Sequence, residues 1–247
     1  MHEPLYINTP AANGLVIFIH GFMGSPRQFD GLLDAVTKQG LSAASLLLPG
    51  HGATIKEFSK STKELWGDHV NSELDRLSRG YSDVWLAGHS MGGLLAINAA
   101  INNPKNVRGL FLIACPLKIM VFSLGAMKAR PVQAFARKGS PVKTAYLTGS
   151  GVSFSAGKLL LMLKPLAELK KLMSSTTAAL GKVAHPVTAF YSKSDELVSI
   201  KSADILKARL NNARLDMSIL DKSMHAYFPE PEKQKIEEAL LKMVTAR

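Results

Sequence analysis

One pentapeptide constrains the fold of this chain more than any other feature. Gly88-His89-Ser90-Met91-Gly92 fits the pattern G-x-S-x-G and stands between an apolar run and a stretch with the Leu, Ala and Ile pattern of a buried helix. A serine on such a tight strand-to-helix turn is held in strained backbone geometry, and glycines on either side let strand and helix approach closely. The pattern predicts that the Ser90 hydroxyl projects from the turn, with the Met91 amide opening the helix beside it.

Apolar runs alternate with helix-like stretches along most of the chain. The runs lie at 15–19, 43–48, 84–87, 107–114, 187–191 and 215–220. Alternation of strand and helix implies right-handed crossovers and a mostly parallel, twisted sheet with helices on both faces. In an α/β sheet of this kind, functional residues gather at the carboxyl ends of the strands.

The alternation breaks between residues 116 and 182. This segment has no convincing strand, only helix-like pieces separated by Gly and Pro, notably at 157–173. We interpret 116–182 as a small helical lid inserted over the strand ends, with 1–115 and 183–247 forming the core. A chain of 247 residues is long enough for one α/β domain with such an insertion.

The same segment carries most of the net charge. The chain has a formal charge of +11, and eleven lysines and arginines between 116 and 185 stand against a single acid, Glu168. A basic lid favours an anionic partner such as a membrane surface, and the alternative is a solvated face that keeps the protein soluble. Nucleic-acid binding is not favoured, because aromatic residues are not interleaved with the basic ones.

Cysteine content and the N-terminal sequence limit the other classes. The single cysteine, Cys115, excludes an intramolecular disulfide and a thiolate zinc cluster, so no metal site is predicted. The N-terminus Met1-His2-Glu3-Pro4 lacks the basic region of a signal peptide, and no apolar run approaches the length of a membrane span. We therefore expect a cytoplasmic protein, with no prediction of its oligomeric state.

Three residues with the chemistry of a nucleophilic site fall at predicted strand ends, in the order Ser90, Asp195, His225. A serine hydroxyl needs a base within hydrogen-bond reach, and the base needs an orienting partner. We assign Ser90 as the nucleophile, His225 as the general base and Asp195 as the acid that orients it. Glu196 and Asp221 are the rival acids, and Asp221 is the stronger rival because it lies on the loop of the histidine.

The loop after the first core strand, His20-Gly21-Phe22-Met23-Gly24-Ser25-Pro26, is the candidate oxyanion loop. Its two glycines permit a turn that points backbone N–H groups at the strand ends, and the amide of Phe22 would share a developing oxyanion with that of Met91. The alternative is a plain turn capped by Ser25, with Pro26 in the first helical turn.

Three further residues near these turns are candidate substrate contacts. They are Gly21 in the oxyanion loop, His51 in the turn Pro49-Gly50-His51-Gly52, and His89 in the elbow. For the two histidines, a structural hydrogen bond within the turn is the ordinary role.

These motifs together resemble the α/β-hydrolase superfamily: the elbow, the loop at 20–26, the turn at 49–52, the turn Ser194-Asp195 and His225. More narrowly, the chain is similar to the small bacterial carboxylesterases related to monoacylglycerol lipases. The likeness covers essentially the whole chain, including the absence of an N-terminal hairpin before the first core strand. It implies that Phe22 and Met91 supply the oxyanion amides and that 116–182 is the cap, inserted after the sixth strand of the family fold. Met224 departs from the small residue usual before the histidine of the family.

The resemblance also implies an activity. Members hydrolyse short- to medium-chain acyl esters or monoacylglycerols without a cofactor, here through an acyl-enzyme on Ser90. An acyl thioesterase or amidase could use the same residues, and the basic lid would suit an acyl-CoA thioester. A non-catalytic binding protein on a hydrolase scaffold is the other alternative, because a fold does not fix a function.

Overall fold

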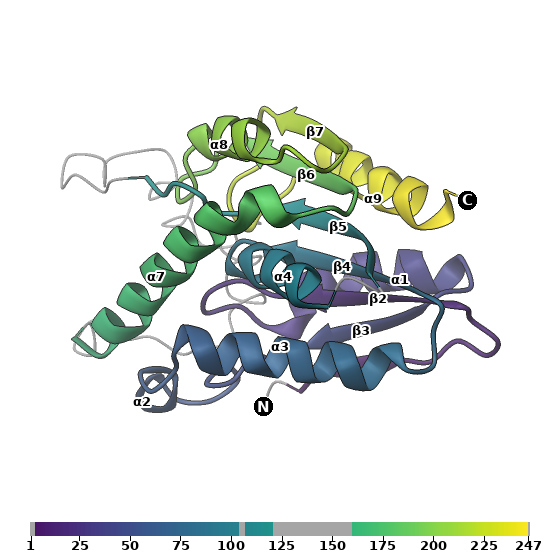
Figure 1. The fold of residues 1–247 in the computed structure, drawn as a ribbon, viewed down its shortest axis with the longest axis horizontal. Helices are drawn as coiled ribbons and strands as arrows, with labels where there is room; N and C mark the ends of the chain where they lie inside the picture. Colours follow the sequence, from purple (N-terminus) through teal and green to yellow (C-terminus); the bar gives the residue numbers. More distant parts are fainter. Residues whose placement is uncertain (1–2, 104–106, 121–159, 247) are drawn as a thin grey trace.

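The computed structural model of the chain describes residues 3–103, 107–120 and 160–246 (Figure 1). Within these ranges, seven strands form one sheet in the order β1-β3-β2-β4-β5-β6-β7. All neighbouring pairs are parallel except β1 and β3. The strands are β1 (Leu5–Ile7), β2 (Gly14–Ile19), β3 (Ser42–Leu46), β4 (Asp83–His89), β5 (Val107–Ile113), β6 (Val187–Ser192) and β7 (Leu215–Leu220).

Each of the six predicted apolar runs forms a strand. The structure differs from the prediction in where β3 ends and in having one additional strand, β1. β3 ends at Leu46 instead of 48, because the Leu48 N–H donates to Nε2 of His20 at 3.1 Å and the chain leaves the sheet there. β1 was not predicted; it has only three residues and pairs antiparallel with β3 and not with the first core strand, β2. Three residues are too few to show a hydrophobic period.

Helices cover both faces of the sheet, as predicted (Figure 1). α1 and α9 bury Leu33, Val36, Ile236 and Leu240 against one face. The other face is covered by α3, α4, α7 and α8, and α4 is buried along most of its length. The helices are η1 (Pro26–Phe29), α1 (Asp30–Lys38), α2 (Ile55–Phe58), α3 (Lys63–Ser78), α4 (Met91–Asn102), α7 (Leu163–Ala179), η4 (Leu180–Lys182), α8 (Lys201–Arg209) and α9 (Glu230–Thr245).

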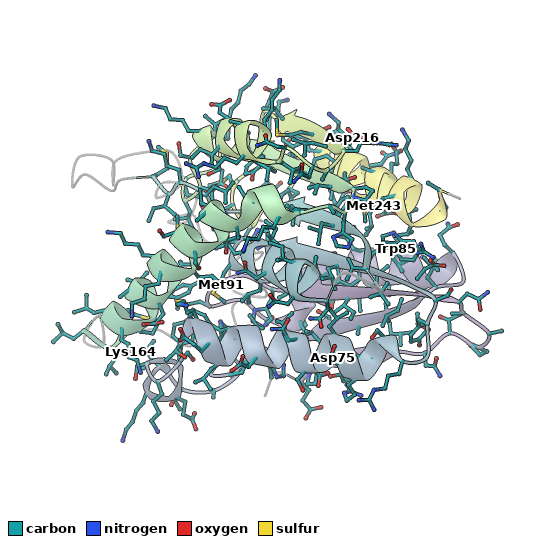
Figure 2. All side chains as sticks on the ribbon, in the orientation of Figure 1. Asp75, Trp85, Met91, Lys164, Asp216 and Met243 are labelled. Atoms are coloured by element: carbon teal, nitrogen blue, oxygen red, sulfur yellow. The ribbon has the colours of Figure 1, made fainter. Side chains whose placement is uncertain are left out.

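Most of the predicted lid, residues 121–159, lies outside the described residues, and so do Lys128, Arg130, Arg137, Lys138, Lys143 and Lys158 of its basic set. α7, which begins at Leu163 with Pro165 in its first turn, is the described part. Its later half packs on the core, where Leu172 is buried and Thr176 Oγ1 accepts from Asn98 Nδ2 at 2.9 Å. Its N-terminal end, near Lys164 in Figure 2, reaches the α2 region, where Lys164 Nζ donates to the Lys60 carbonyl at 3.3 Å.

None of the helices in the described ranges is long and apolar enough to cross a membrane.

Candidate active site

The turn between β4 and α4 has the strained geometry that the glycine spacing predicted. Ser90 is the N-cap of α4 and adopts φ 53° and ψ −123°, a left-handed φ that is uncommon for a residue with a side chain. Its N–H donates to the Ile113 carbonyl at the end of β5 at 2.8 Å, which holds the turn on the sheet. The observed backbone confirms the predicted elbow.

The two outer glycines of the motif are required by close approach. A Cβ on Gly92 would overlap the carbonyl oxygen of Ile19, and one on Gly88 would lie 2.5 Å from the Gly93 nitrogen. Any side chain at these positions would push α4 away from β2 and β4. The pattern therefore serves the packing of the helix on the strands, and Ser90 itself is buried, with 7% of its surface exposed.

We expect Gly92→Ala to lower the free energy of unfolding by about 3 kcal/mol, because backbone atoms and not a flexible side chain occupy the space that the methyl group needs. For a chain of this size the melting temperature should fall by roughly 6–12 °C. Gly67→Ala in α3 is the matched control: a Cβ there meets nothing within 4 Å, so helix propensity alone should stabilise the protein slightly. The measurement is the melting temperature of both variants by calorimetry. Equal melting temperatures of the two variants would contradict the packing argument.

The candidate oxyanion loop is held by the buried ring of His20. His20 Nε2 accepts from the Leu48 N–H, so Nδ1 carries the proton and donates to the Gly21 carbonyl at 3.0 Å, which also accepts from the Gly24 N–H at 2.9 Å. In a trans peptide the C=O and the following N–H point in opposite directions. Fixing the Gly21 carbonyl therefore fixes the direction of the Phe22 amide.

Two other features of this loop bear on the sequence predictions. A Cβ on Gly21 would lie 3.0 Å from the Ser90 Cβ, which places Gly21 directly beside the elbow. Pro26 begins η1 and Ser25 is its N-cap residue, as the alternative for this loop expected. The Ser25 side chain, however, makes no capping hydrogen bond, and its buried hydroxyl has no partner in the described part of the chain. The turn leads into the 3₁₀ helix η1. There the Ser25 carbonyl accepts from the Gln28 N–H.

Asp195 and His225 meet at the ends of β6 and β7. Nδ1 of His225 lies 2.9 Å from Oδ2 of Asp195, and both side chains are buried. The other carboxylate oxygen, Oδ1, accepts from the N–H groups of Leu197 and Val198, each at 2.8 Å. This arrangement holds the proton of neutral His225 on Nδ1 and leaves Nε2 with a free lone pair.

The electrostatics of the pair favour charge on both members. Burial lowers the pKa of His225, but the charge and hydrogen bond of Asp195, with the charge of Glu196, outweigh it and raise that pKa above 6.5. Burial raises the pKa of Asp195, and the charge and hydrogen bond of His225 with the two backbone amides bring it below its ordinary value. An imidazolium that forms at His225 is therefore stabilised.

The two rival acids occupy other positions. Asp221 is exposed and pairs with Lys193 Nζ at 2.7 Å. Glu196 turns toward the histidine loop, where its carboxylate accepts from the backbone N–H of His225 at 3.1 Å. Glu196 therefore holds the main chain of His225, while Asp195 contacts the ring.

The other two candidate histidines make structural hydrogen bonds. His89 Nε2 lies 2.8 Å from the carbonyl of His225, and the two rings are 4.8 Å apart, so the elbow contacts the histidine loop directly. His51 Nδ1 lies 3.2 Å from the Pro49 carbonyl. Burial lowers the pKa of His89 to about 3, and the charge of His225 acts in the same direction; burial lowers the pKa of His51 to about 4. Both rings are neutral near pH 7, and their predicted contact with substrate stays a prediction.

One positioning residue was missed. The Glu232 carboxylate accepts from the N–H groups of Asp221, Lys222 and Ser223, and thereby anchors the start of the histidine loop on α9. The one available clue was an acid in the first turn of a helix that follows the loop. In the described ranges, no group of three or more His, Cys, Asp or Glu side chains is placed to hold a metal ion.

A mostly parallel sheet with a strained serine turn at one strand end and a buried Asp–His pair at two others defines an α/β protein of the hydrolase type. Comparison with known proteins makes this specific. The model of the alpha/beta hydrolase family matches residues 16–234, and the chain belongs to that family.

Its relatives include lipases and esterases. A thermostable monoacylglycerol lipase of Bacillus sp. (strain H-257) is 26% identical over 226 residues, which cover 90% of this chain and 86% of the lipase. Among solved structures, that of the metagenome-derived lipolytic enzymes LipS and LipT superposes with a TM-score of 0.76 at 20% identity, covering 99% of this chain and 98% of the other. The monoacylglycerol lipase of Paleococcus ferrophilus gives a TM-score of 0.74 at 18% identity, with 98% of each chain covered.

Proposed function

We propose that the protein is a serine hydrolase that cleaves carboxylic esters through an acyl-enzyme on Ser90. The observation that carries this proposal is the buried Asp195–His225 pair, in which the carboxylate holds the ring proton on Nδ1. In that tautomer of the neutral imidazole, the lone pair of Nε2 is the proton acceptor. The similarity to a monoacylglycerol lipase along most of the chain supports ester hydrolysis. The strained turn at Ser90 and its link to the histidine loop through His89 support the choice of nucleophile.

In the proposed reaction, Ser90 Oγ attacks the acyl carbon while Nε2 of His225 takes the hydroxyl proton. The carbonyl oxygen becomes an oxyanion and accepts hydrogen bonds from the amides of Phe22 and Met91. His225 then gives the proton to the leaving alcohol as the C–O bond breaks. Water, activated by the same imidazole, attacks the acyl-enzyme, releases the carboxylic acid and restores Ser90.

We further propose that the segment 116–182 is a lid and that the substrates are short- to medium-chain esters or monoacylglycerols. The exposed leucines Leu163 and Leu166 on α7, with exposed Lys164 and Lys170 beside them, support contact with an anionic lipid surface. The same machinery could cleave thioesters or amides.

A graded panel tests the substrate class. It contains p-nitrophenyl esters of increasing acyl length, monoacylglycerols in anionic and in neutral vesicles, acyl-CoA thioesters and acyl amides. The proposal expects the highest kcat/KM on esters and faster turnover in anionic vesicles. If only thioesters were turned over, the substrate class would be thioesters and not carboxylic esters. If no compound of the panel were turned over, the result would favour a binding protein on this scaffold.

The pH dependence of ester hydrolysis should report His225. The base must be neutral, so kcat/KM should rise with pH through the pKa of His225, which Asp195 holds above 6.5. His89, with a pKa of about 3, stays neutral throughout this range and adds no second step. In Ser90→Ala, NMR titration of the His225 imidazole should give the same pH midpoint as the kcat/KM profile of the wild type. The double variant that also carries Asp195→Asn should have a lower midpoint. A midpoint that does not move on that change would contradict the proposed pairing.

A further inference from the structure

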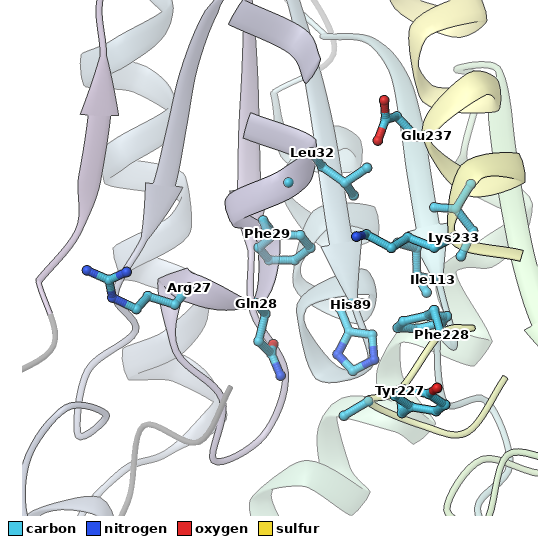
Figure 3. Close-up of a pocket in the computed structure, with 13 residues that line it drawn as sticks. Arg27, Gln28, Phe29, Leu32, His89, Ile113, Tyr227, Phe228, Lys233 and Glu237 are labelled. Atoms are coloured by element: carbon cyan, nitrogen blue, oxygen red, sulfur yellow. The ribbon is translucent and has the colours of Figure 1, made fainter. Parts of the chain in front are cut away.

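A cavity that is partly open to solvent lies on the face of the sheet opposite α4, between α1 and α9. Its volume is about 270 Å³. The apolar part of its wall comes from η1, α1, β5, α9 and the segment that follows His225 (Figure 3). These residues are Phe29, Leu32, Ile113, Phe228 and Ile236.

One wall of this cavity is aromatic and uncharged. His89 lines it with a buried ring, and burial lowers the pKa of His89 to about 3, so the imidazole carries no charge near pH 7. In Figure 3 the rings of Phe29, His89 and Phe228 surround the hollow, and the side chain of Lys233 extends across it. Tyr227 adds a fourth ring to the lining.

The two cations of the lining, Arg27 and Lys233, pair with acids outside it. Arg27 lies 3.3 Å from Asp30, and Lys233 lies 3.2 Å from Glu230. Glu237 also lines the cavity, so the charges of the lining are mixed in sign. Neither an anion nor a cation is favoured by this balance, whereas the apolar wall disfavours any ion.

Size and wall chemistry together indicate the occupant. A dry cavity of roughly 150 Å³ lined by Leu, Ile and Phe is large enough for benzene. The cavity here has nearly twice that volume, and aromatic walls favour a ring in edge-to-face or offset contact. We propose that the cavity is a binding site for a small, uncharged aromatic molecule of one or two rings, with a lining that adjoins the serine site through His89 and Tyr227 but contains none of Ser90, Asp195 and His225.

Gly31 offers a way to fill the cavity from α1. It lines the cavity, and a Cβ there would meet only Lys233 Cε, at 3.9 Å. Leucine at this position should therefore enter the space without displacing the backbone. Gly67→Leu on α3 is the matched control, because Gly67 is another helical glycine with nothing within 4 Å of its Cβ, and it does not line this cavity.

The test is a titration with indole, followed by NMR of ¹³C-labelled isoleucine methyl groups. Ring currents should shift the methyl signals of Ile113 and Ile236 in the full-length protein, with saturation at millimolar indole or below. Gly31→Leu should weaken binding by about tenfold or more, and Gly67→Leu should leave it unchanged. If Gly31→Leu does not fold, Leu32→Trp fills the same space and should give the same loss.

Three results would overturn the proposal. One is the absence of saturable shifts at Ile113 and Ile236, and another is equal indole affinity in the wild type and the filled variants. A third result is that indole only inhibits ester hydrolysis competitively, with equal potency in both glycine variants. That result would show that indole binds in the serine site and not in this cavity. The methyl titration needs no enzymatic activity, so it decides the binding site even if the proposed hydrolase function fails.

Discussion

Replacing Ser90 with alanine is expected to lower kcat for p-nitrophenyl butyrate by about four to six orders of magnitude, because the proposed acyl-enzyme cannot form. The methyl group of alanine fits wherever the serine Cβ fits. The left-handed φ of 53° at this residue is strained for serine and alanine alike, so the melting temperature should change little. KM should stay close to that of the wild type when substrate binding does not depend on the hydroxyl.

The measurement is a steady-state assay at high protein concentration, with circular dichroism as the check on folding. Serine-to-alanine changes at Ser194 and Ser199, close to Asp195, are the matched controls and should leave kcat close to that of the wild type. Activity of Ser90→Ala within about tenfold of the wild type, in a folded protein, would remove Ser90 from the mechanism.

Asp195→Asn should lower kcat by about four orders of magnitude. Two backbone N–H groups donate to Oδ1, so the amide oxygen of asparagine should take that position and turn its NH₂ group toward the His225 ring. The NH₂ group can only donate, and Nδ1 would then have to accept. The proton would move to Nε2, which could no longer take the proton of Ser90.

The matched control is Asp221→Asn. Asp221 is the rival acid on the histidine loop, but its carboxylate is exposed and pairs with Lys193, and an exposed pair of this kind contributes little to stability. Its activity should therefore stay within a few-fold of the wild type. If Asp221→Asn lost the rate and Asp195→Asn kept it, the acid of the triad would be reassigned.

The elbow was predictable because its sequence requirements are local. Gly88 and Gly92 are needed wherever a helix returns onto its strand this closely, because an added Cβ would overlap the backbone of Gly93 or Ile19. The meeting of Asp195 with His225 was predictable for a different reason: residues at the ends of neighbouring parallel strands share one edge of the sheet, and β6 and β7 are neighbours.

Contacts that depend on side-chain direction were not predictable from spacing. Glu196 was judged only as a rival acid, yet its carboxylate holds the backbone of His225. His20 was named only as the first residue of the candidate oxyanion loop, whereas its ring joins that loop to the segment that follows β3. Glu232 reaches the histidine loop because of how α9 packs on the sheet, which no sequence period encodes. β1 was missed because three residues carry too little pattern.

The central claim is that Ser90 is a nucleophile activated by His225. Its most direct test is exposure of the protein to a fluorophosphonate probe, followed by digestion and mass spectrometry of the peptides. The account predicts one adduct per chain, on Ser90, formed in step with the loss of esterase activity and far more slowly in His225→Ala. An adduct on another residue, or full activity after complete labelling of Ser90, would contradict it.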